Sequence, residues 1–108
     1  MKKFLALYNL PAEGFDAFKN MSEADQQSEK QAWTPWMEAH KDSFVDLGNP
    51  VGSNKRVTKG EVSDVRNEVG GYSIVQAEDH EAACAIFTDC PHLNVPGAYI
   101  EVVEMTKM

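Results

Sequence analysis

The sequence carries too little basic charge to favour a nucleic-acid partner. Its 108 residues include 17 acidic and 10 basic side chains, which gives a formal net charge of -7. Proteins that bind phosphate backbones gain affinity from Lys and Arg side chains that displace counterions. The densest basic group, Lys55, Arg56 and Lys59, is small enough to belong to a solvated loop. We therefore expect no nucleic-acid partner.

Long apolar runs and cysteines are also scarce. No segment approaches the roughly 20 apolar residues that cross a bilayer, so we expect no membrane partner. The N-terminus imitates the start of a signal peptide, but its apolar run ends at Asn9 and no small-residue cleavage site follows. Cys84 and Cys90 are too few for the disulfide framework of a small secreted protein. A cytoplasmic location is the expectation.

Metal and phosphate motifs are missing as well. Cys84, Cys90 and His92 do not have the spacing of a four-ligand zinc site, and two buried small apolar cysteines are the better interpretation. Gly70 and Gly71 precede an expected strand rather than a helix N-terminus, so they do not form a loop that holds phosphate. We expect no metal and no cofactor.

What is present is the composition of one globular domain spanning residues 1–108. Hydrophobic residues make up 43% and charged residues 25% of the chain. A domain of this size buries only about two-thirds of the surface of its unfolded chain. Its margin of stability is therefore thin, and a core shared with a second copy would increase it.

In the first half of the chain, apolar periodicity predicts one strand and a long helical region. The strand covers 3–9 and is followed by a loop over 11–21 that Phe15 and Phe18 anchor. Ser22 is an expected helix N-cap, and Pro35 either kinks the helix or starts a new one. The apolar face of this helix runs from Trp33 to Leu47, and Gly48 ends it.

In the second half, the patterns predict two strands around a helix, after a weaker strand over 54–62 that Gly60 interrupts with a bulge. Gly70 and Gly71 mark a turn before a strand over 72–77. Asp79 caps a helix that runs to about Thr88. The last strand covers 99–105.

The order strand, helix, strand, strand, helix, strand predicts an α+β fold of the ferredoxin-like, split βαβ type with an antiparallel sheet. Both helices then cover one face of the sheet. The strands nevertheless have apolar side chains on both faces, with Leu5, Leu7, Tyr72 and Ile74 opposite Phe4, Ala6, Tyr8, Val75 and Ala77. A monomer would expose the second set, so we expect a homodimer through the sheet face, a dimeric α+β barrel.

Three stretches of the chain resemble the YCII-related, or DGPF-domain, family. They read WTPW followed by DLGNPVG (33–36 and 46–52), GGYSIVQAEDHEAA (70–83) and DCPHL (89–93). The resemblance spans nearly the whole chain and implies a ferredoxin-like dimeric α+β barrel, in a family with many members of unassigned activity. Some better known members are linked to a His and Asp pair in a cleft. The Asp-Gly-Pro-Phe segment is replaced here by Lys59-Gly60-Glu61-Val62, so no catalytic role is carried over.

Four residues are candidates for a site. His40 projects near the apolar face of the long helix, where an imidazole could act as acid or base. Tyr8, Trp36 and Asp64, with His40, could line one cleft between helix and sheet. A histidine at the edge of a packed core, among core aromatic residues, explains the same pattern.

These candidates support three hypotheses of function. The leading one is a homodimer that binds a small organic molecule in a cleft between helix and sheet. The second is an isomerase- or lyase-type enzyme in which His40 or Asp64 transfers a proton. The third is an accessory dimer without a ligand, and a filled core around His40, Trp36 and Asp64 would favour it.

Overall fold

An antiparallel sheet with the strand order β2-β5-β1-β6 forms the centre of the protein. The computed structural model describes residues 1–107, and the side chains of Phe15 and Phe18, the expected loop anchors, lie outside the described residues. The strands of this sheet are β1 (Lys2–Asn9), β2 (Phe44–Asp46), β5 (Val69–Ala77) and β6 (Tyr99–Glu104). The helical elements are α1 (Ala12–Lys19), α2 (Glu23–Ala39) and α3 (His80–Ile86), with short 3-10 turns η1 (Lys41–Ser43) and η2 (Pro91–Asn94).

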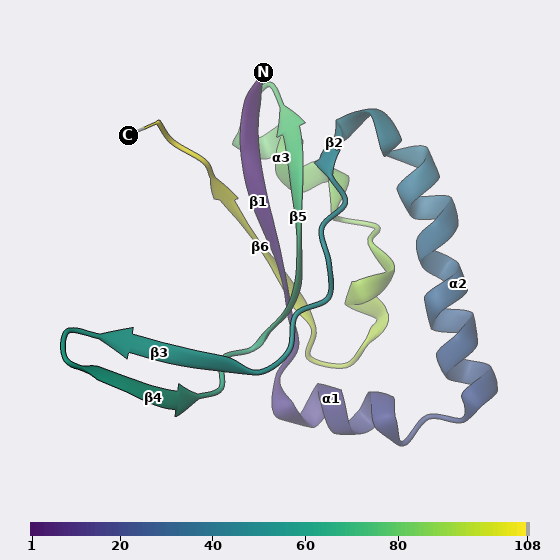
Figure 1. The fold of residues 1–108 in the computed structure, drawn as a ribbon. Coiled ribbons are helices and arrows are strands. Elements are labelled where there is room, and N and C mark those ends of the chain that lie inside the picture. The colour runs from purple at the N-terminus through teal and green to yellow at the C-terminus, as the bar shows by residue number, and fades with distance from the viewer. Residues whose placement is uncertain (108) are drawn as a thin grey trace.

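The topology confirms the predicted α+β fold of the ferredoxin-like type. β1 lies between β5 and β6 and pairs antiparallel with both, while β2 pairs with the other side of β5. Two interleaved units, β1 to β2 through α1 and α2, and β5 to β6 through α3, therefore build one sheet. α2 stands at one side of the sheet, with η2 between them (Figure 1).

The second strand of the sheet is not the one that the sequence predicts. β2 is formed by Phe44–Asp46, which the apolar spacing placed on the long helix. Residues 54–62, the predicted strand, instead contribute to a separate hairpin of β3 (Asn54–Thr58) and β4 (Glu61–Val65) that projects away from the sheet and from α2 (Figure 1). Gly60, expected in a bulge, lies in the turn between them with a φ of 87°. Apolar residues three or four positions apart are typical of a helix, but the same spacing can continue past a helix end into a strand. The spacing alone therefore does not show where α2 ends.

Two further expectations about local structure are wrong. Residues 12–19, predicted as a loop, form α1, in which Glu13 and Lys19 lie at the helix ends that favour their charges. Gly70 and Gly71 lie inside β5 rather than in a turn, and a Cβ on Gly71 would stand 3.6 Å from the ring of Tyr8. A glycine pair in a strand marks a place where other groups approach the backbone closely.

The predicted helix starts are confirmed by their capping hydrogen bonds. The Ser22 side chain accepts from the backbone N–H of Asp25, and Asp79 accepts from Ala82 at 2.7 Å. Pro35 lies inside one continuous α2, so it starts no new helix. The two helices end earlier than expected, at Ala39 and Ile86.

The core lies between the sheet and the helices. Alternate residues of β1 and β5 point into it, and Phe4, Ala6 and Val75 have no exposed surface. Trp36 of α2 and Phe87 after α3 pack against these strands, with ring centroids 5.7 Å apart. None of the helices in residues 1–107 is both long enough and apolar enough to span a membrane.

Candidate functional site

A cleft of about 1400 Å³ opens between the helical layer and one end of the sheet. α2 and η2 form one wall, and the connection from Leu47 to Ser53 with the base of the β3–β4 hairpin forms the other. β1 and β5 supply the floor through Tyr8, Gly71 and Ser73. The cleft therefore combines residues of α2, η2, the central sheet and the β3–β4 hairpin.

The connection after β2 is held firmly against β5. The N–H of Tyr72 donates to the carbonyl of Asn49, and the N–H of Val51 donates to that of Gly70. Gly48 lies so close to β5 that a Cβ on it would stand 1.7 Å from the Tyr72 carbonyl oxygen, and its φ is 76°. Only glycine fits there, so this wall of the cleft has a fixed course.

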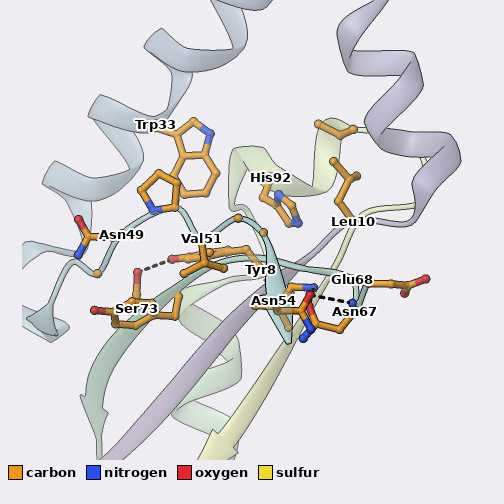
Figure 2. A pocket seen from close by; sticks show the side chains of 18 of the residues that line it. Tyr8, Leu10, Trp33, Asn49, Val51, Asn54, Asn67, Glu68, Ser73 and His92 are labelled. Carbon is orange, nitrogen blue, oxygen red and sulfur yellow. Dashed lines mark hydrogen bonds between the residues drawn. The ribbon is translucent and has the colours of Figure 1, made fainter. Parts of the chain in front are cut away.

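Aromatic rings surround the floor of the cleft. The Tyr8 ring meets Trp33 edge to face at 5.3 Å and His92 edge to face at 5.6 Å. Trp33 also contacts Trp36 at 5.6 Å. Figure 2 shows Trp33 and His92 standing over the Tyr8 ring, with the indole nitrogen of Trp33 turned away from it. Such walls suit a flat, apolar molecule.

A directed chain of hydrogen bonds ends at Tyr8. The Ser73 hydroxyl lies 2.7 Å from the carbonyl oxygen of Leu47, which can only accept, so Ser73 donates its hydrogen there. The Tyr8 hydroxyl lies 2.8 Å from the same Ser73 oxygen and must therefore be the donor of that bond (Figure 2). Burial raises the pKa of Tyr8 to about 12, so the side chain is a neutral phenol.

His92 is the half-buried imidazole of the cleft. Its Nε2 lies 2.8 Å from the carbonyl oxygen of Asn9, so Nε2 carries a hydrogen. Burial lowers the pKa of His92 below its ordinary value of 6.5, against the opposing effect of hydrogen bonds to the backbone of Asn9 and Tyr99. The ring is thus neutral near pH 7, with its hydrogen on Nε2.

Charged side chains lie at the rim rather than on the floor. Glu29 and Lys30 come from α2, and Lys55 and Asp64 pair across the hairpin. Further along the rim, the side chain of Asn54 accepts from the N–H of Asn67 at 3.2 Å (Figure 2). The floor is therefore neutral, and charge meets a ligand only near the opening.

The four sequence candidates do not all meet in this cleft. Tyr8, Trp36 and Asp64 line it, whereas His40 is not among the lining residues. Trp36 is only 5% exposed, and its indole N–H donates to the Ile86 carbonyl and to Asp89, so it contributes mainly a wall. The Asp64 side chain is 87% exposed. These positions leave Tyr8 as the candidate on the floor.

His40 lies at the end of α2 beside a different group. Its Nε2 is 3.5 Å from a carboxylate oxygen of Asp89, and its ring contacts Trp36 at 5.6 Å. The sequence correctly predicts that His40 lies near the apolar face of the long helix. The cleft, however, lies nearer the start of that face, beside Trp33.

Three residues of the site, Trp33, Ser73 and His92, were not among the sequence candidates. The sequence draws attention to His92 only beside Cys84 and Cys90, whose spacing does not fit a zinc site. Cys90 is buried, and burial raises the pKa of its thiol to about 12, so it is a neutral apolar residue. Cys84, also expected to be buried, is exposed. The DCPHL stretch is the signal that could have indicated His92, because this side chain directly follows the proline that begins a 3-10 turn.

Comparison with known proteins supports the fold. No protein-family model and no curated protein matches the chain. A solved structure with similar architecture is the 5-chloro-2-hydroxyhydroquinone dehydrochlorinase TftG from Burkholderia phenoliruptrix AC1100, in complex with 2,5-dihydroxybenzoquinone. The match has a TM-score of 0.50 and 14% identity, and covers 94% of this chain and 91% of that one. At this identity the likeness shows the α+β fold alone.

Proposed function

We propose that this protein is a YCII-related homodimer that binds a small, neutral aromatic molecule in the cleft over Tyr8. The observation that carries this proposal is the neutral floor enclosed by aromatic rings, with charge confined to the rim. Apolar walls with a few placed polar groups are the usual character of small-molecule sites.

The structural neighbour adds support of a general kind. TftG was solved with 2,5-dihydroxybenzoquinone, so a fold like this one can hold a single-ring organic molecule. The rings of Trp33 and His92 contact Tyr8 and each other, at 6.4 Å, so together they form an aromatic wall against which a flat ring could stack in this chain too. Charged ligands would lose hydration over this floor without gaining a partner of opposite charge.

The second part of the proposal is the homodimer through the free face of the sheet. Leu5 pairs with Ile74 on one side and with Val103 on the other, which makes an apolar row across three strands. Val103 is 46% exposed, and the helices cover the opposite face. A second copy is complementary to such a row when the two sheets pack about a two-fold axis.

An isomerase- or lyase-type reaction in the same cleft is the alternative function. The candidates from sequence, His40 and Asp64, lie outside the cleft and at its rim. His92 is better placed, because it is neutral and touches the Tyr8 ring on the floor. A reaction that His92 serves as base is expected to be lost in His92→Gln and retained in His40→Gln.

The test is a titration of the ¹⁵N-labelled protein with 4-methylphenol, followed by amide chemical shifts. Shifts should concentrate at Gly71, His92 and their neighbours. Trp33→Ala removes an aromatic wall and should weaken binding about tenfold. Leu93→Ala, an exposed apolar neighbour of His92 outside the cleft, is the matched control. Shifts scattered over the surface, or equal losses in both variants, would contradict the proposal.

A further inference from the structure

We infer that the cleft selects aromatic molecules that donate a hydrogen bond, such as phenols, over matched molecules that only accept. This inference rests on the proposed function and adds the chemical class of the ligand. It follows from the direction of the hydrogen bonds on the floor rather than from the shape of the cleft.

The first acceptor is the Tyr8 oxygen. Because Ser73 gives its hydrogen to Leu47, the hydrogen of Tyr8 is used in the bond to Ser73. A phenol oxygen that has donated still has electron pairs with which to accept. Since Tyr8 lines the cleft and stays neutral, it offers a ligand an acceptor and no hydrogen.

The second acceptor is Nδ1 of His92. The Asn9 carbonyl holds the hydrogen on Nε2, and the lowered pKa of the ring keeps Nδ1 without one near pH 7. His92 and Tyr8 come from different elements but touch at 5.6 Å. The neutral His92 ring thus brings a second acceptor atom on a lining residue, beside the ring of Tyr8.

The two indole N–H groups near the floor are used elsewhere or point away from it. The Trp36 N–H is used by Ile86 and Asp89, and the Trp33 nitrogen is turned away from Tyr8 (Figure 2). A carbonyl or ether oxygen against Tyr8 would meet another electron pair and lose its bonds to water. A hydroxyl on a flat ring would donate to the Tyr8 oxygen while its ring packs against the aromatic wall of Trp33 and His92.

The experiment compares 4-methylphenol with 4-methylanisole, its methyl ether, by amide shift titration at pH 7.5. The phenol is neutral there and has the hydrogen that the ether lacks. We expect the phenol to bind about tenfold more tightly, the effect of one hydrogen bond to a desolvated partner. Equal affinities, or tighter binding of the ether, would overturn the inference while leaving the proposed function in place. Binding of neither compound would overturn both.

Variants of the hydrogen-bond chain make the test specific. Ser73→Ala frees the hydrogen of Tyr8, so the preference for the phenol should fall several-fold or reverse, because the ether can now accept. Tyr8→Phe should reduce the preference, leaving only His92 as acceptor. Ser63→Ala on the hairpin removes a hydroxyl outside the cleft and should leave the ratio unchanged. A purely structural role of Ser73 would lower both affinities and leave their ratio intact, which would contradict the inference.

Discussion

The two faces of the central sheet are built by alternate residues of the same strands and meet different surroundings. On the helix face, Phe4 and Val75 have no exposed surface. On the other face, Leu5 and Ile74 are half-buried and Val103 is 46% exposed, although these side chains are as apolar. Apolar alternation on both faces of a strand therefore does not mean that the chain buries both faces: one forms the core, and the other is the face through which we propose that two copies pack.

The largest effect should come from the helix face. Phe4→Ala removes a fully buried ring and should lower the free energy of unfolding by about 3–5 kcal/mol, a large part of the total stability of a small domain. Urea unfolding followed by circular dichroism measures it. Val62→Ala, at an exposed apolar position of the hairpin, should stay within about 0.5 kcal/mol. A small loss in Phe4→Ala would mean that the core can collapse around the gap.

A change on the free face should alter assembly more than folding. Val103→Lys places a charge in the apolar row beside Leu5 and should convert the proposed dimer to a monomer, because an unpaired charge in an interface is costly. Light scattering at micromolar concentration measures the mass. Val57→Lys adds the same charge to the hairpin, 75% exposed, and should leave the dimer intact. A monomeric unmodified protein would refute the dimer.

The smallest predicted effect is on the pH dependence of stability, and it comes from His92 at the edge of the helix face. Its pKa is lower in the folded chain than in the unfolded chain, so the unfolded chain binds more protons as the pH falls through about 6.5. Stability contributed by the neutral ring is thus present above that pH and is lost as the pH falls. The melting temperature should drop less between pH 7.5 and 5.5 in His92→Gln than in the unmodified protein. An equal drop in both would show that other groups cause it.

Where local chemistry decides the structure, the sequence is a good guide. Ser22 and Asp79 cap their helices because their side chains reach an N–H three residues on, a contact that depends on neighbours alone. Apolar alternation likewise gave β1 and β6 and the two-sided sheet. The prediction failed at Phe44, whose spacing from Trp36 fits a helix but which pairs with Val75 in the sheet.

The site is less predictable than the fold, and its members show why. Tyr8 and Ser73 are 65 residues apart, and His92 reaches the carbonyl of Asn9 across 83 residues. Sequence spacing does not predict these contacts, because they depend on the register of β1 against β5 and on the turn that carries His92. Tyr8 could be proposed because an aromatic residue at a strand end is conspicuous.

By itself, then, the sequence determined the α+β class, the helix starts and the apolar character of both sheet faces, since periodicity and capping act between near neighbours. Only the tertiary structure decided that His40 lies outside the cleft, that His92 lies inside it, and that Tyr8 has given its hydrogen to Ser73. The direction of a hydrogen bond depends on which partners meet, and here they meet only after the strands have paired.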